Sequence, residues 1–190
     1  MRDQTRRHKE FRQQVRPLLT RLLGAARRQA GGSAFAEDWL QETFLRAWRD
    51  YDQLKEEQSL YAWLLKILDR VIAEDIRRES RRNRLAPLVN VDDEFFNSHP
   101  AAQPGPFEKT VTEQAESQIN QAIDELPDEY RKAVLLRDIE ELSYREIAYI
   151  LDLPQGTVMS RLSRGRRLLA QRLIRVGVQD GCAVQLQKGE

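Results

Sequence analysis

The chain has 190 residues, of which 41% are hydrophobic and 32% are charged, enough apolar material for one ordinary domain or two small ones. Lysine and arginine number 31 against 30 acidic residues, so the net charge of +1 does not by itself indicate a nucleic-acid partner. The single cysteine, Cys182, excludes an internal disulfide framework. The sequence has no apolar run of the ~20 residues that a membrane span needs and no signal peptide, so we expect a cytoplasmic protein without membrane insertion.

The first 84 residues are expected to be helical throughout. Ser33 and Ser59 are candidate N-caps, each followed by an amphipathic segment. The two apolar stripes recur every three or four residues, and they are Leu40, Phe44, Ala47 and Tyr51 in the first segment and Leu65, Leu68, Ile72 and Ile76 in the second.

The segment 85–117 has four prolines, lacks helical periodicity and is predicted to be a linker. Between 85 and 130 the chain is acidic, with Lys109 as its one base, whereas 159–175 has six arginines and no acid. The predicted fold is therefore all-α, with two small helical domains joined by a flexible acidic linker. The expected boundaries are 1–84, 85–117, 118–176 and a loose tail at 177–190.

The stretch 143–169 has the pattern of a helix-turn-helix. Ser143 and Glu146 form a capping box, Asp152 and Pro154 separate two helices, and Gly156 is expected to let the second helix begin in a tight space. A shared apolar core is expected from Ile147, Leu151, Leu153, Val158 and Leu162.

The second helix of this motif would enter a DNA major groove. Arginine and serine side chains on its outer side can contact base edges, and the remaining arginines can bind phosphates. With four to six phosphates neutralised, log affinity should fall with log salt at a slope of roughly −4 to −5. The alternative is a helical hairpin whose arginine-rich face is merely solvated.

A second basic segment, "RRESRRNR", ends the helix that starts near Tyr61 and Trp63. These two aromatic residues either stack on unpaired bases or belong to the core. The acidic residues near Asp38 and Glu42 lack the histidines and spacing of a metal or catalytic site, so they form a solvated face or a protein-docking face. His8 and His99 stand alone, and we expect no metal or other cofactor.

Both halves together resemble an extracytoplasmic-function sigma factor of bacterial RNA polymerase. "AEDWLQETFLRAWRDYDQL" resembles the region 2 helix that docks on the polymerase clamp, and "SLYAWLLKILDRVIAEDIRRESRR" resembles the promoter-melting helix. "LPDEYRKAVLLRDIEELSYREIAYILDLPQGTVMSRLSRGRRLL" resembles region 4 along its whole length. The resemblance covers about two-thirds of the chain.

The resemblance implies a role for each group of residues. Those that would face the polymerase are Asp38, Gln41, Glu42 and Arg46. Those that would hold the melted −10 strand are Lys55, Ser59, Tyr61, Trp63, Lys66, Arg70, Arg77 and Arg78. Those that would contact the duplex −35 element are Thr157, Met159, Ser160, Arg161, Ser163, Arg164 and Arg167.

Four positions depart from the usual family pattern. Arg70 stands where the family usually has asparagine, and Glu74 stands where it often has aspartate. Leu54 takes the place of the loop's usual aromatic residue, and Met159 occupies a position that is often basic. We therefore expect unusual base preferences at both promoter elements.

The predicted function is that of a non-catalytic alternative sigma factor, monomeric when free, that binds core RNA polymerase and promoter DNA and is controlled by an anti-sigma factor. Two rival hypotheses remain. An autonomous helix-turn-helix regulator explains 143–175 but leaves 35–84 unassigned, and a nuclease using Asp38 and Glu42 would depend on added metal.

Overall fold

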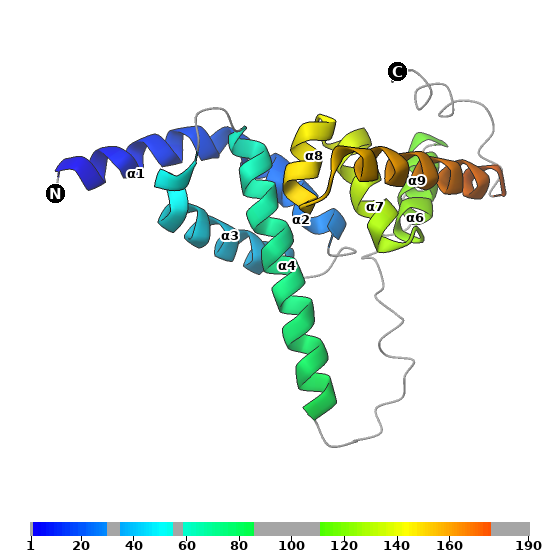
Figure 1. Ribbon diagram of the computed structural model, residues 1–190, viewed down its shortest axis with the longest axis horizontal. Coiled ribbons are helices and arrows are strands. Elements are labelled where there is room, and N and C mark those ends of the chain that lie inside the picture. Colours follow the sequence, from blue (N-terminus) through cyan, green and yellow to red (C-terminus); the bar gives the residue numbers. More distant parts are fainter. Residues whose placement is uncertain (1, 30–34, 55–58, 86–110, 176–190) are drawn as a thin grey trace. The chain divides into compact units, whose positions relative to one another are not determined.

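The computed structural model describes residues 2–29, 35–54, 59–85 and 111–175, and every regular element within these ranges is a helix (Figure 1). The chain divides into two compact units, Met1–Gln103 and Pro104–Glu190. The prediction of an all-α protein built from two helical domains is therefore confirmed. The limits of 85 and 117 for the linker stay predictions, as does the loose tail, which lies outside the described residues.

Within its described residues, the first unit contains four α-helices and two single 3-10 turns. They are α1 (Arg2–Val15), η1 (Arg16–Leu18), α2 (Leu19–Gln29), α3 (Ala36–Asp50), η2 (Tyr51–Gln53) and α4 (Leu60–Leu85). Pro17 lies in η1, where its missing N–H interrupts the hydrogen-bond ladder between α1 and α2. The helical prediction for the first 84 residues is confirmed over the part that the structure describes.

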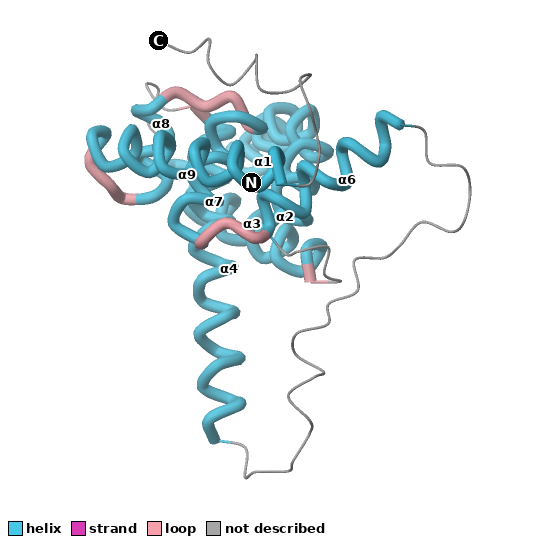
Figure 2. The backbone as a smooth tube through the Cα atoms, turned by 90° about the vertical axis from the view of Figure 1, so that its right-hand side faces the viewer, coloured by secondary structure: helices cyan, strands magenta, loops and turns pink. Residues whose placement is uncertain are grey.

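The core of the first unit lies where α3 packs against α2 and α4. Its buried side chains include most of the two predicted stripes, namely Leu40, Ala47, Leu65, Leu68 and Ile72. The second stripe ends one turn earlier than predicted, because Ile76 is 55% exposed. Beyond this point α4 continues past the other helices of its unit, as Figures 1 and 2 show.

The N-cap expected at Ser59 is confirmed. Its hydroxyl accepts a hydrogen bond from the backbone N–H of Ala62 at 3.4 Å, and its carbonyl accepts from Trp63 at 3.0 Å. The first bond satisfies one of the N–H groups that the first turn of a helix leaves unpaired, and the second is the first backbone bond of the helix itself. The other expected cap, Ser33, lies outside the described residues.

The second unit contains α6 (Val111–Asp124), α7 (Asp128–Val134), the π-helical turn η3 (Leu135–Ile139), α8 (Tyr144–Leu151) and α9 (Gln155–Arg175). The helix α6 begins within the segment that the sequence analysis assigns to the linker. The stretch 111–124 contains no proline or glycine and several good helix formers, which favours this earlier start.

The predicted capping box at the start of α8 is confirmed. The Ser143 hydroxyl accepts from the Glu146 N–H at 3.3 Å, and the Glu146 carboxylate accepts from the Ser143 N–H at 2.9 Å. At the other end, Asp152 adopts the left-handed conformation (φ 52°) and donates its N–H to Ala148. Asp152 thus ends α8 as expected, and α9 follows after a short turn.

Gly156 was expected to let α9 begin in a tight space. This expectation is wrong, because a Cβ at this position would meet nothing within 4 Å. The close approach occurs instead at Gly165, in the middle of α9. A Cβ there would lie 2.8 Å from Val134 Cγ2 and 3.2 Å from Tyr130 Cβ. The absence of a side chain at Gly165 therefore sets how closely α9 packs on α7.

The two glycines provide a matched test. We expect Gly165→Ala to lower the free energy of unfolding of the second unit by about 1 kcal/mol, because overpacking outweighs the gain in helix propensity. Gly156→Ala should leave it unchanged or raise it by up to ~1 kcal/mol. Denaturant unfolding of the full chain, followed by far-UV circular dichroism, measures both. An equal or increased stability of Gly165→Ala would contradict the close packing.

Candidate nucleic-acid and polymerase interfaces

One face of α9 is exposed along the whole predicted recognition surface. Its exposed residues are Met159, Ser160, Ser163, Arg164 and Arg167, whose spacing places them on a single side of the helix. Thr157 and Arg161 are half-buried and lie at the edges of this face. The structure therefore brings the seven residues predicted for the −35 element together, five of them exposed.

The opposite face of α9 is buried against the rest of the second unit. Val158 and Leu162 are 0% and 2% exposed, as the predicted core requires, and Leu169 continues the same stripe. Ile147 of α8 is also fully buried, whereas Leu151 and Leu153 are half-buried. Because α9 is held from beneath, its outer face has no packing role.

Two arginines at the margins of α9 pair with acidic residues that precede the helix-turn-helix. Arg161 Nη2 lies 3.2 Å from Glu129 Oε2 of α7, and Arg172 Nη1 lies 3.2 Å from Glu125 Oε2. Arg161 is therefore paired within its unit in this conformation, and its predicted contact with the −35 element stays a prediction. These ion pairs could not be predicted from the composition of 159–175, which has no acidic residue. The acidic partners lie more than thirty positions earlier in the chain.

Arg166 forms the most buried ion pair of α9. Its Nε and Nη2 atoms donate to the Asp138 carboxylate at 3.2 and 2.5 Å, and the two side chains are 24% and 15% exposed. The hydrogen bond to Asp138 raises the pKa of Arg166 above its ordinary value, with burial acting in the opposite direction. A bidentate pair of this kind fixes the rotation of α9 relative to η3.

The turn between η3 and α8 is held by Arg137. Its guanidinium donates to the Leu142 carbonyl at 2.9 Å and lies 5.0 Å from the centre of the Tyr144 ring. Glu141, within this turn, has a positive φ of 55°. These contacts position the start of α8, and so the whole helix-turn-helix, relative to η3.

The acidic face of α3 was predicted to contact the polymerase. Asp38 and Gln41 are exposed, and Leu45, one turn further along the same side, is 62% exposed. Leu45 was not among the residues predicted for this surface, although its place outside the predicted apolar stripe was a usable signal. A single exposed leucine is common on protein surfaces, so Leu45 is of interest only because it lies beside Asp38 and Gln41.

The other two predicted residues of this set are engaged inside the unit. Arg46 pairs with Glu42 at 2.7 Å and with Glu74 of α4 at 2.8 Å. The hydrogen bonds to Glu42 and then Glu74 raise the pKa of Arg46 above its ordinary value. Arg46 therefore joins α3 to α4 at the wall of a groove of about 390 Å³ instead of projecting freely toward a partner.

The residues predicted for the −10 element divide into an exposed and a buried group. Arg70, Arg77 and Arg78 of α4 are exposed, and Arg77 donates to the Ala73 carbonyl at 2.9 Å. Ser59 is exposed but serves as the N-cap of α4. Lys55 lies outside the described residues.

Tyr61, Trp63 and Lys66 form the buried group, with exposed fractions of 6%, 7% and 8%. All residues from 61 to 66 are buried, so the first turns of α4 are enclosed on every side. The Arg21 guanidinium lies 4.1 Å from the centre of the Tyr61 ring. Of the two alternatives left open for these rings, the structure shows burial in the core, and the −10 roles of Tyr61, Trp63 and Lys66 stay predictions.

Two further expectations concern metals and membranes. Among the described residues, no group of three or more His, Cys, Asp or Glu is placed to hold a metal ion. His8 packs edge-on against the Trp48 ring, with 5.1 Å between ring centres, and His99 lies outside the described residues. No helix in the described ranges has both the length and the apolar character needed to cross a membrane.

Comparison with known proteins identifies the family. Residues 14–82 match sigma-70 region 2, and residues 116–169 match sigma-70 region 4. The RNA polymerase sigma-H factor of Pseudomonas aeruginosa is 30% identical over 155 residues, which cover 80% of each chain. The chain is an extracytoplasmic-function sigma factor. The ECF RNA polymerase sigma-E factor of Escherichia coli K12 is 32% identical over 134 residues, or 70% of each chain.

Solved structures agree with this assignment. The sigma factor RpoE of Bartonella quintana, solved in complex with the anti-sigma factor NepR, has a TM-score of 0.69 and 25% identity, with 87% of this chain and 98% of that one covered. CnrH, solved with the cytosolic domain of CnrY, has the same fold at a TM-score of 0.62 and 20% identity, with coverage of 88% and 90%. This sigma factor therefore has the family's helical fold, and it acts as an alternative sigma factor in transcription initiation.

The ion pairs of Arg166 and Arg161 differ in burial, which allows a direct comparison. In a double-mutant cycle, Arg166→Gln with Asp138→Asn should give a coupling energy of about 1–2 kcal/mol, because the pair is bidentate and largely buried. The matched cycle of Arg161→Gln with Glu129→Gln should give less than about 1 kcal/mol, since solvent screens this pair. Denaturant unfolding of the seven proteins, which share one wild type, measures both cycles. Equal coupling energies would show that Arg166 does not hold α9 on η3.

Proposed function

We propose that this sigma factor binds core RNA polymerase through region 2, recognises the −35 element with α9 and traps the melted −10 strand along α4. The main support for this proposal is that one chain matches both region 2 and region 4 of the sigma-70 family. In addition, the polar face of α9 is exposed. Its contribution is binding energy and specificity, and catalysis belongs to the polymerase. The domain limits are proposed as 1–84, 85–117 and 118–176.

The proposed −35 contacts are those of the exposed face of α9. Arg164 is well suited to guanine, whose major-groove edge accepts two hydrogen bonds from a guanidinium. Ser160 donates its hydroxyl to the Thr157 carbonyl at 2.9 Å, so its oxygen remains available as an acceptor toward DNA. Met159, 49% exposed, offers an apolar contact such as the thymine methyl group requires.

The proposed −10 surface lies on the exposed half of α4. Arg70, Arg77 and Arg78 supply positive charge along the helix, and Lys55 and Ser59 would contribute from its start. Cations that follow the backbone of a single strand provide most of the affinity, which makes binding sensitive to salt. Tyr61, Trp63 and Lys66 would then act by supporting α4 from within the core.

The proposed polymerase contact is the surface formed by Asp38, Gln41 and Leu45 on α3. Leu45 adds a central apolar group to the polar residues, as is common in protein interfaces. Glu42 and Arg46 would set the position of α3 on α4. The supporting observations are the exposure of the first three residues and the ion pairs of the other two.

We further propose that an anti-sigma factor controls this protein in the cytoplasm, where it is monomeric when free. The support is its likeness to RpoE of Bartonella quintana, which was solved with the anti-sigma factor NepR. Such a partner would cover both DNA-binding surfaces. A genetic screen that finds no inhibitory partner, with constitutive activity of the free protein, would contradict this part of the proposal.

Run-off transcription tests the proposal directly. Core polymerase stripped of its own sigma factor is mixed with this protein and genomic promoter fragments. Discrete transcripts that are absent without the protein are expected, and their start sites would reveal both promoter elements. No transcripts, combined with tight and salt-sensitive duplex binding by the protein alone, would favour an autonomous helix-turn-helix regulator instead.

A matched pair of arginines on α9 tests the −35 surface. Arg164→Gln should weaken promoter binding by the holoenzyme about tenfold, because a bidentate contact to a base contributes roughly 1–3 kcal/mol. Arg172→Gln, which removes the same charge from a residue paired with Glu125, should change it less than about twofold. Filter binding at several salt concentrations measures both. Equal losses would mean that general charge, and not the exposed face, determines the affinity.

A further inference from the structure

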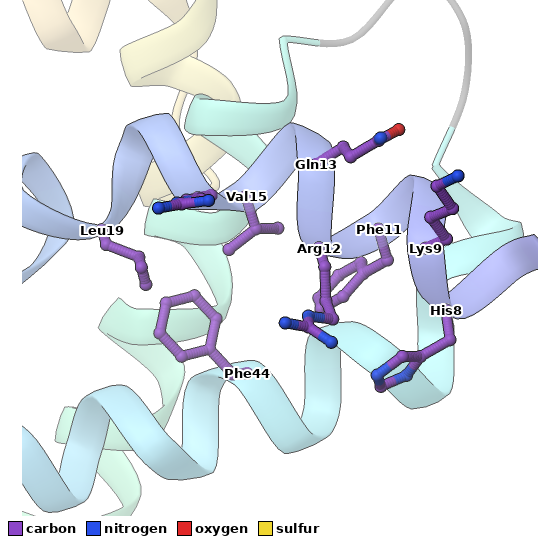
Figure 3. Close-up of a pocket in the computed structure, with 9 residues that line it drawn as sticks. His8, Lys9, Phe11, Arg12, Gln13, Val15, Leu19 and Phe44 are labelled. Atoms are coloured by element: carbon purple, nitrogen blue, oxygen red, sulfur yellow. The ribbon is translucent and has the colours of Figure 1, made fainter.

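A groove of about 740 Å³ lies in the first unit between α3 and the segment formed by α1, η1 and α2 (Figure 3). Val15, Leu19 and Phe44 point into the same space from opposite sides, and Arg12 extends toward α3. None of these residues belongs to the DNA-binding or polymerase-binding surfaces described above. The groove is partly built by residues before position 14, where the region 2 match begins.

The floor of the groove is preformed. Phe11 and Val15 are 7% and 5% exposed, and the Phe11 ring packs edge-on against Trp48 and Tyr51 at centre distances of 5.4 and 5.1 Å. Leu19 remains 40% exposed above this floor. A ligand would therefore cover an apolar surface without having to open the helices.

The charges around the groove have one sign. Its lining contains Arg12 and Arg16 and no acidic residue. Among the side chains that the structure describes, neither arginine has an ion-pair or hydrogen-bond partner. Elsewhere on α1, by contrast, Arg6 pairs with Glu10 at 3.1 Å and Arg7 with Asp52 at 2.9 Å.

We propose that this groove binds a short acidic amphipathic helix of a partner protein. The apolar side of that helix would cover Leu19 and Phe44, and its Asp or Glu residues would face Arg12 and Arg16. A nucleic acid would gain little from an apolar floor, and a flat membrane surface fits a concave groove poorly. The proposal goes beyond promoter-directed transcription and does not depend on it.

The probe for the test is a fluorescein-labelled synthetic helix of about 16 residues, with leucine on one face and glutamate on the others. A peptide of the same composition in scrambled order is its control. Binding to the full-length protein is measured by fluorescence anisotropy. Vesicles of phosphatidylglycerol, tested in a separate flotation assay, report on membrane binding.

Two matched pairs of variants locate the site. Leu19→Gln should weaken binding of the amphipathic peptide roughly five- to tenfold, whereas Leu45→Gln, at an exposed leucine outside the groove, should not. Arg12→Gln should weaken it about threefold, whereas Arg6→Gln, the same charge change on the same helix, should have less effect. Thermal unfolding confirms that all four variants fold.

The proposal predicts binding of the amphipathic peptide alone, with losses confined to the two groove variants. It is overturned if that peptide does not bind, if the scrambled peptide binds equally well, or if the members of each pair behave alike. Vesicle binding without peptide binding would assign the surface to a membrane instead. Run-off transcription with the same variants is scored separately, so failure of the docking proposal leaves the proposed sigma function intact.

Discussion

The second unit depends on the close packing of α9 against α7, which a side chain at Gly165 would obstruct. With this contact made, Val158 and Leu162 are buried beneath the helix, and Arg166 reaches Asp138 on η3. The buried stripe and the bidentate pair together determine which side of α9 faces outward. The polar face available for DNA is therefore a consequence of packing on the other side of the helix.

In the second unit, the described arginines of α9 divide into a group paired with acidic residues and a group that is exposed. The acidic residues before the helix-turn-helix are not merely a separate acidic segment, since Glu125, Glu129 and Asp138 each pair with an arginine of α9. This arrangement neutralises the inner and lateral cations, while Arg164 and Arg167 remain exposed. Positive charge is thus concentrated on the face that we propose for DNA, although the net charge of the chain is only +1.

In the first unit a single long helix combines two environments. The 26 residues of α4 extend about 39 Å, and residues 61–66 are buried while residues 76–82 are exposed. The ion pairs of Arg46 and the 2.9 Å hydrogen bond from Trp39 Nε1 to Asp75 fix its middle to α3. A rigid support of this kind allows the exposed arginines of α4 to present a defined surface to DNA.

Sequence alone was sufficient for features that depend on neighbouring residues. The caps at Ser59 and Ser143, the end of α8 at Asp152 and most of both apolar stripes follow from short-range spacing, and the motif of 126–169 was specific enough to indicate the family. Features that depend on distant partners could not be predicted in this way. The burial of Tyr61 and Trp63, the pairing of Arg161 with Glu129 and the role of Gly165 required the tertiary structure, because each is decided by a helix that packs from elsewhere in the chain.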